Sequence, residues 1–158
     1  MFSAVAMIGG TCVSRLHERV RLLKAFRSQI LSVKRRLSVG RPSFYELFDK
    51  CDDAFIYPFF DIISQQMKKG KPPDEAVKKA FNCADGARLL KRDEREVLSG
   101  CFASISISDI ATALRILDNA CKELDTYIEQ ATDEERKNAK PVMSVAVYIG
   151  LAAVILLW

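Results

Sequence analysis

Apolar residues recur at helical spacing along most of this chain. They return every seven residues between Leu16 and Leu37, and a later seam between Ile110 and Ala131 alternates steps of four and three. This spacing places apolar side chains on one face of an α-helix, and no long stretch alternates with the period of two that a half-buried strand requires. The sequence therefore predicts an all-α fold.

Turn residues divide the pattern into a helical bundle of about five to six helices. We expect helices over residues 11–39, 54–69, 73–81, 91–102 and from 110 onward. Gly40-Arg41-Pro42 closes the first, Pro42 and Ser43 open a short helix through Phe48, and Asp109 provides an N-cap for the last. The last seam consists of Ile110, Leu114, Leu117, Cys121, Leu124, Ile128 and Ala131. We interpret it as a core face packed antiparallel on the first helix, and self-association through it is the less favoured alternative.

The final stretch, residues 141–158, carries no charge and runs to Trp158. From Val142 it corresponds to about 26 Å of helix against a hydrocarbon core of about 30 Å. Lys137 and Lys140 precede it, and an indole at Trp158 suits the far interface. We predict a C-terminal transmembrane helix with these residues as its anchor flanks. A buried core helix is the alternative, but a core helix is rarely apolar all round.

The first segment, residues 1–14, is also apolar and uncharged. We expect a short, truncated anchor, because its helix would be only about 21 Å long. A secretory signal peptide is disfavoured, since no positive charge precedes the apolar run. Residues 15–140 then form one cytoplasmic helical-bundle domain, because positive charges flank both apolar segments on its side.

Basic residues gather at the start of that domain. The segment 15–41 holds nine of them against Glu18 alone, a net charge of +8, so the rest of the +4 chain sums to −4. We expect a surface for lipid head groups or an acidic partner, with a solvated helix face as the bland alternative. Its candidate residues are Arg15, Arg19, Arg21, Lys24, Lys34, Arg35 and Arg36. Nucleic acid is a less favoured partner, because Phe26 is the lone aromatic side chain interleaved there.

Catalytic and metal-binding patterns are missing from the sequence. There is no phosphate loop, nucleophile elbow or Glu-x-x-His pattern, and the lone histidine, His17, has no matching ligands. The acidic pairs 52–53 and 94/96 are interpreted as helix caps. The five cysteines are expected to be small core residues in a reducing compartment. We therefore expect a protein that is not an enzyme and binds neither a metal nor a cofactor.

The whole chain resembles the stage III sporulation protein AB family. The resemblance rests on the apolar start, the run Arg15 to Arg21, Gly40-Arg41-Pro42, Glu96-Val97-Leu98, Ile105, Asp109, the long amphipathic helix, Asn138, Lys140 and Gly150. That family is similar to the membrane platform proteins of type II secretion and type IV pilus machines. Glu96 and Asp109 are polar positions that recur in it.

The resemblance implies a role in the channel between mother cell and forespore. The chain would sit in the mother-cell membrane around the forespore, with its helical domain in the cytoplasm. There it would couple a stage III sporulation AA-type ATPase to the other channel proteins. A platform subunit of another secretion or pilus machine is the alternative within this class. A basic membrane-tethered binder of nucleic acid or anionic lipid is the alternative of another class, and a homo-oligomer is left open.

Overall fold

The structure is a computed structural model that describes residues 2–40, 43, 46–47, 51 and 53–156, with side chains over the part from 14 to 137. The described residues form helices and turns and contain no strand, which confirms the all-α prediction. The helices with described bounds are α1 Phe2–Val39, α3 Tyr57–Lys68, α4 Pro73–Cys83, α5 Arg92–Ile105 and α6 Ile110–Leu156, and a 3₁₀ helix, η1, spans Asp85–Leu89.

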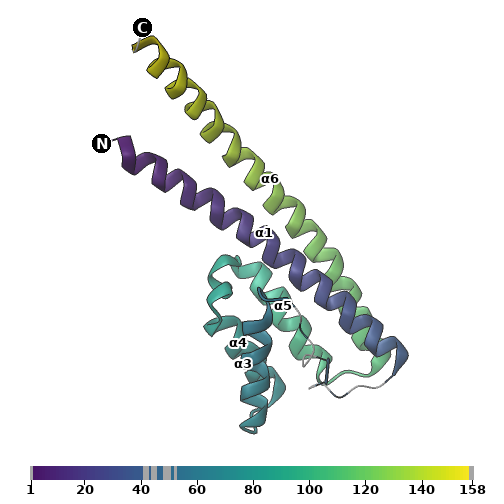
Figure 1. Cartoon of the computed structure of the whole chain (residues 1–158). Helices are drawn as coiled ribbons and strands as arrows, with labels where there is room; N and C mark the ends of the chain where they lie inside the picture. Colours follow the sequence, from purple (N-terminus) through teal and green to yellow (C-terminus); the bar gives the residue numbers. More distant parts are fainter. Residues whose placement is uncertain (1, 41–42, 44–45, 48–50, 52, 157–158) are drawn as a thin grey trace.

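Two long helices, α1 and α6, run antiparallel along the length of the molecule, and both chain ends lie at the same end of this pair (Figure 1). The predicted antiparallel packing of these helices is therefore confirmed. The helices α3, α4 and α5 pack beside the part of this pair that lies away from the chain ends. The long pair projects beyond them toward the chain ends (Figure 1).

The boundaries of α1 and α6 differ from those predicted. Helix α1 begins at Phe2, well before residue 11, and it ends at Val39 as expected, where Gly40 N donates to Arg36 O at 3.2 Å. Helix α6 continues to Leu156 without a backbone break at Pro141. An interior proline removes one helical hydrogen bond, and neighbouring turns can carry the helix across it. The apolar end segments therefore continue the long helices.

The shorter helices begin and end near their predicted residues. Pro58 lies in the first turn of α3, and Pro73 opens α4 with two acids behind it. Gly70 ends α3 with φ of 77°, a conformation that glycine adopts without the steric penalty of a side chain. The 3₁₀ helix η1 was not predicted, because five residues are too few to show a period.

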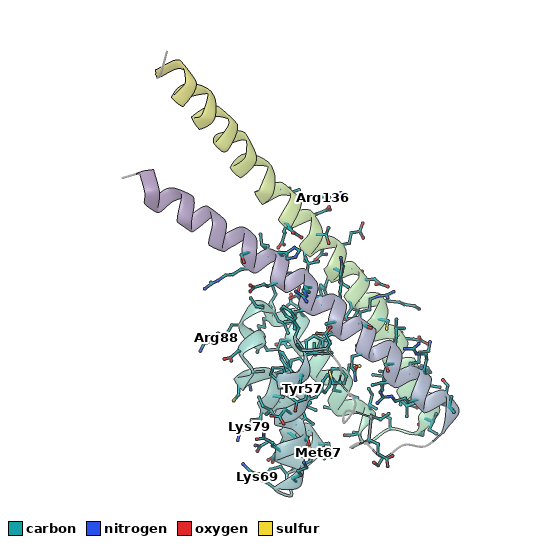
Figure 2. The ribbon with its side chains drawn as sticks, viewed as in Figure 1. Tyr57, Met67, Lys69, Lys79, Arg88 and Arg136 are labelled. Carbon is teal, nitrogen blue, oxygen red and sulfur yellow. The ribbon has the colours of Figure 1, made fainter. Side chains whose placement is uncertain are left out.

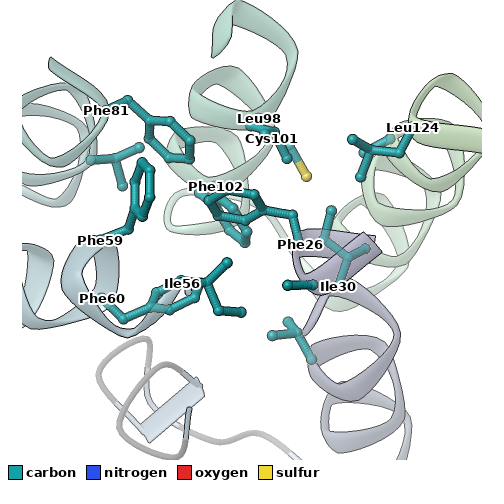
Figure 3. Close-up of a cluster of buried hydrophobic side chains, with 14 of the residues drawn as sticks. Phe26, Ile30, Ile56, Phe59, Phe60, Phe81, Leu98, Cys101, Phe102 and Leu124 are labelled. Atoms are coloured by element: carbon teal, nitrogen blue, oxygen red, sulfur yellow. The ribbon is translucent and has the colours of Figure 1, made fainter. Parts of the chain in front are cut away.

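Five phenylalanines form the centre of the core (Figure 3). The ring of Phe26 on α1 lies 5.0 Å from that of Phe59 on α3 and 5.5 Å from that of Phe81 on α4, measured between centroids. Phe60 and Phe102 complete the cluster, at 6.4 Å and 6.3 Å from Phe26. Edge and offset contacts of this kind add to the hydrophobic burial. One residue of α1 thus contacts aromatic rings from three other helices.

The two predicted seams face this core. On α1, Val20, Leu23, Phe26, Ile30, Val33 and Leu37 are buried. On α6, Leu117, Cys121, Leu124 and Ala131 are buried, and Leu114 and Ile128 pack at its margin. The spacing of apolar residues therefore predicted the buried face of both long helices.

The short helix expected after Gly40 is described only at its start. Ser43 Oγ accepts from Glu46 N at 3.3 Å, and Ser43 N donates to Glu46 Oε2 at 2.9 Å. This reciprocal pair is a capping box, and Leu47 behind it is buried. Residues 44, 45, 48–50 and 52 lie outside the described part of the chain, so the rest of that helix remains a prediction.

No helix within the described part of the chain is both long enough and apolar enough to cross a membrane. The side chains of residues 1–13 and 138–158 lie outside that part. The two predicted anchors fall on these residues and remain predictions.

Candidate functional site: the charged residues of α1

Two ion pairs and a histidine–carboxylate hydrogen bond connect the basic side of α1 to α6. Arg27 pairs with Asp125 and Lys34 with Asp118, and His17 Nδ1 lies 2.9 Å from Glu135 Oε1. All three pairs are solvent-accessible, and such pairs contribute about 0 to 1 kcal/mol each. Their main effect is to fix the register of α1 against α6, because the two helices run antiparallel with these residues opposite one another. Part of the excess charge of α1 is therefore neutralised within the molecule.

The fourth connection, from Arg19, is buried. Its guanidinium binds the Glu94 carboxylate of α5, with Nε 3.2 Å from both carboxylate oxygens. The same guanidinium donates through Nη1 to Glu134 Oε2 of α6 at 2.7 Å. Arg19 is 5% exposed and Glu94 is fully buried. One side chain of α1 thus joins α5 and α6 at once.

Lys91 contacts both of these carboxylates. Its Nζ donates to Glu134 Oε1 at 2.6 Å, and its backbone N–H donates to Glu94 Oε2 at 2.8 Å. Glu94 therefore serves both as the capping acid of α5 and as the partner of a buried arginine. We call Arg19, Lys91, Glu94 and Glu134 the Arg19 cluster.

The pKa values within the Arg19 cluster follow from these contacts. Burial by itself lowers the pKa of Arg19, but the hydrogen bonds and charges of Glu94 and Glu134 outweigh burial, so this pKa is raised. The hydrogen bond from Lys91, followed by that from Arg19, lowers the pKa of Glu134. The contacts thus favour the charged forms of Arg19 and Glu134.

The position of Arg19 corrects its assignment to the exposed basic surface. The buried residues Val20, Leu23 and Phe26 follow it on the same helix, and Leu23 lies one helical turn away. A charge at this place requires a buried partner. Arg19 therefore belongs to the internal structure of the bundle.

The other candidate residues of α1 occupy three kinds of environment. Arg15, Lys24 and Arg35 are exposed. Arg21 lies over the ring of Phe55, 4.2 Å from its centroid, and this cation–π contact leaves its charge accessible. Lys34 pairs with Asp118, and Arg36 donates to Leu47 O at 3.2 Å. The exposed basic surface of α1 is thus smaller than the sequence suggested.

The remaining predicted residues have local roles or lie outside the described side chains. Glu96 is exposed and accepts from Arg92 Nε at 2.9 Å. Asp109 caps α6, because its Oδ2 accepts from Thr112 N at 3.2 Å. The hydrogen bond from the Thr112 side chain, followed by that from its backbone, lowers the pKa of Asp109. Lys137 is exposed, whereas the side chains of Lys140 and Trp158 are not described.

Glu94 and Glu134 were missed as partners of Arg19. The sequence places Glu94 in the first turn of a helix, where an acid is already explained by capping. The available signal was Arg19 itself, a charged residue at a buried position of a helix. Identifying its partner required the relative placement of α1, α5 and α6, which depends on contacts distant in the sequence.

The described cysteines have different environments. Cys101 and Cys121 are buried, and burial raises the pKa of the Cys101 thiol to about 12, which leaves it protonated and unreactive. Cys51 is half-buried. Cys83 is exposed, which corrects the expectation of a core residue. Among the described residues, no group of three or more histidine, cysteine or acidic side chains could hold a metal ion.

Comparison with known proteins assigns the chain to a family. A family model described as stage III sporulation protein AB matches residues 1–158, the whole chain. No curated protein and no solved structure matches the chain.

Proposed function

Because the chain belongs to the stage III sporulation protein AB family, we propose that it is a non-enzymatic membrane platform of the channel between mother cell and forespore. In this role it links a cytoplasmic stage III sporulation AA-type ATPase to the other channel proteins. The match over residues 1–158 carries the sporulation part of this proposal. The platform role rests on the resemblance to secretion platforms and on the charged surfaces of the helical domain.

Membrane attachment is supported by the course of the two long helices. The uncharged C-terminal stretch belongs to α6 as far as Leu156, and the apolar residues 2–14 belong to α1. Both ends lie on one side of the molecule (Figure 1), so both could enter the same membrane while α3, α4 and α5 remain outside it. The exposed Arg15 and Lys137 lie next to these ends, where anionic head groups attract cations.

A coupling role is supported by how the helices are joined. The Arg19 cluster joins both long helices to α5, and Phe26 joins α1 to α3, α4 and α5. A partner bound to α3, α4 or α5 would therefore act on helices that continue toward the membrane. Exposed charges on these helices suit a charged ATPase surface, and such a contact would weaken as salt rises.

Deletion of the gene in its spore-forming host tests the proposal first. We expect normal vegetative growth and completed engulfment but few heat-resistant spores. Complementation with the full chain should restore spores. Normal sporulation of the deletion strain would refute the sporulation role.

The membrane tether is tested in the same strain. A chain lacking residues 141–158 should not complement, whereas a chain carrying an unrelated transmembrane helix in their place should complement. Complementation by the chain without any such segment would refute the tether while leaving the sporulation role intact.

A further inference from the structure

A positive surface lies on the outer side of α3 and α4. Residues 65–83 hold five lysines and two acids, a net charge of +3, although the chain outside residues 15–41 sums to −4. The side chains of Lys69, Lys79 and Arg88 lie on one edge of the bundle, the edge away from the two long helices (Figure 2). This surface is therefore separate from the basic side of α1.

An open hollow of about 400 Å³ follows the exposed face of α4. Its α4 residues recur at steps of three, one, three and one, and the residues between them are buried, so they share one face of the helix. Gln66 near the end of α3 and Lys71 in the following turn complete the lining. We call this the α4 hollow, and its α4 residues are Glu75, Lys78, Lys79, Asn82 and Cys83.

Gln66 provides a positioned hydrogen-bonding group in the α4 hollow. It is 9% exposed, and its Oε1 accepts from Lys79 Nζ at 3.3 Å. Its Nε2 donates to no other residue in the described part of the chain. A donor that packing already holds in place binds an acceptor with little further loss of side-chain entropy. The hollow therefore offers a fixed amide donor beside an ammonium group.

The lysines of the α4 hollow are only weakly neutralised. Lys79 contacts the neutral amide of Gln66 and no acid among the described residues. Lys71 and Lys78 each pair with an acid four residues away, at N–O distances of 3.2 Å and 3.9 Å, and more than half of every side chain in these pairs is exposed. Exposed pairs of this kind are weak in water, so their lysines remain available to another acceptor. Three lysines beside Glu75 leave the hollow positively charged.

Helix capping does not explain this grouping of lysines. A cation stabilises the last turn of a helix, which accounts for Lys68 at the end of α3. Lys78 and Lys79 precede the last turn of α4, and that turn holds no basic residue. Ammonium groups around one hollow repel one another, so an anion placed between them relieves the repulsion. The α4 hollow thus favours an anionic ligand.

The donors of the hollow favour a carboxylate over a phosphate. Phosphate suits the fork of an arginine or the backbone N–H groups at the start of a helix. Here the donors are lysines and side-chain amides, and the carboxylate of Glu75 stands among them. A singly charged acceptor meets less repulsion from Glu75 than a phosphate dianion does.

The position of the hollow favours a protein over lipid head groups. The turn between α3 and α4 lies away from both chain ends (Figure 1). The attraction of an anionic membrane falls off within a Debye length, about 10 Å. With the membrane at the chain ends, head groups act on Arg15 and Lys137 and do not reach the hollow. This step rests on the tether of the proposed function.

We propose that the α4 hollow docks an acidic segment of a partner protein. One carboxylate of that segment enters the hollow and accepts from Gln66 Nε2 and Lys79 Nζ, and neighbouring carboxylates bind the lysines at its rim. Docking here deepens the proposed coupling role, because α4 contacts α1 directly. The ring of Phe81 on α4 stacks on that of Phe26 on α1, 5.5 Å away between centroids.

The full-length chain in a mild detergent provides the test, with a fluorescent oligoglutamate peptide as the probe. The substitutions Cys12→Ser/Cys51→Ser leave Cys83 as the exposed thiol, because Cys101 and Cys121 are buried. Peptide binding should raise the fluorescence anisotropy and slow the alkylation of Cys83, which lines the hollow. Both effects should weaken as salt is raised.

Three variants separate docking in the hollow from attraction by net charge. Lys71→Gln/Lys79→Gln should weaken peptide binding about tenfold in Kd. Arg115→Gln/Lys122→Gln removes the same charge from the exposed side of α6 and should change Kd by less than about twofold. Gln66→Met keeps the net charge and should weaken binding about fivefold, the effect of one neutral hydrogen bond. Circular dichroism checks the helical content of each variant.

A wild-type chain that does not bind the peptide, or binds it without protecting Cys83, would overturn the inference. Equal losses in the two double variants would also overturn it, as would an unchanged Kd in Gln66→Met. Equal protection of Cys83 by inorganic phosphate would show a site for phosphate groups and would overturn the carboxylate assignment. Peptide binding is measured without the host, so a deletion strain that sporulates normally would refute the sporulation role and leave this result standing.

Discussion

At the scale of single residues, Arg19 shows how one charge can fix the position of three helices. Its guanidinium is too deeply buried to be hydrated, so its stability depends on Glu94 and Glu134. Buried ion pairs contribute little compared with apolar side chains of similar size, but removing one partner leaves an uncompensated charge. The cluster therefore constrains geometry more than it adds stability.

Replacement of Glu94 by alanine tests this dependence. We expect a loss of about 3 to 5 kcal/mol in the free energy of unfolding, because Arg19 keeps its charge without its buried partner. The matched control is Glu96→Ala, an exposed acid in the same helix, with an expected change within about 0.5 kcal/mol. Denaturant unfolding followed by circular dichroism measures both. Equal effects of the two substitutions would contradict a buried role for Glu94.

The double variant Arg19→Met/Glu94→Leu makes a separate prediction. It removes both charges and keeps apolar volume, so it should recover most of the stability that Glu94→Ala loses. The same unfolding experiment applies. A double variant as unstable as Glu94→Ala would show that the lost hydrogen bonds of Glu94, including its cap of α5, rather than the unpaired charge, cause the loss.

Two glycines make opposite predictions for substitution by alanine. At Gly100 a Cβ enters open space, so Gly100→Ala should stabilise the isolated chain by about 1 kcal/mol. At Gly86 a Cβ would lie 3.0 Å from Phe59 Cε2, so Gly86→Ala must displace a core ring and should destabilise the fold. Melting temperatures of the two variants at low protein concentration should move in opposite directions.

At the scale of elements, the helices and the antiparallel packing of α6 on α1 were predictable, whereas the partners of α3, α4 and α5 were not. The apolar seams of α1 and α6, the start of α4 at Pro73 and the cap at Asp109 depend on neighbours close in the sequence. The first helix was predicted to begin at about residue 11, with residues 1–14 as a separate short anchor, whereas α1 is continuous from Phe2. Pairing of Arg19 with Glu94 joins residues 75 positions apart, and no local pattern specifies such a contact.

The N-cap of α6 gives a prediction at this scale. Asp109→Ala should lower the free energy of unfolding by about 1 kcal/mol, because Thr112 N loses its acceptor at the start of the longest helix. Asp109→Asn keeps an acceptor and should retain most of the stability. Thermal unfolding of the three chains measures the difference. Equal losses for Ala and Asn would indicate that the charge, rather than the hydrogen bond, is required.

At the scale of the whole molecule, the lowered pKa of Glu134 makes stability depend on pH. Its ordinary pKa is 4.5, and Lys91 and Arg19 lower the value in the folded state. The stabilisation is therefore complete above about pH 4.5 and is lost as the pH falls through the folded-state pKa. The lowered pKa of Asp109 likewise stabilises the folded state at neutral pH, and this contribution is lost on acidification.

A pH series tests this linkage. The melting temperature of the wild type should fall as the pH is lowered from 7 to 3. The melting temperature of Glu134→Gln should be lower than that of the wild type at pH 7. It should also fall less over the same range, since this variant has no carboxylate to protonate at this position. Parallel curves for the two chains would contradict the contribution of Glu134.

The placement of the Arg19 cluster makes the long helical pair a lever. The cluster joins α1 and α6 to the start of α5, and beyond it the pair projects toward the chain ends without α3, α4 or α5 beside it (Figure 1). The cluster is then the fulcrum, and it lies near the middle of both long helices, so the arm toward the chain ends and the arm within the bundle are of similar length. A sideways displacement of the helices within the bundle would then be passed to the chain ends in the opposite direction and at similar size.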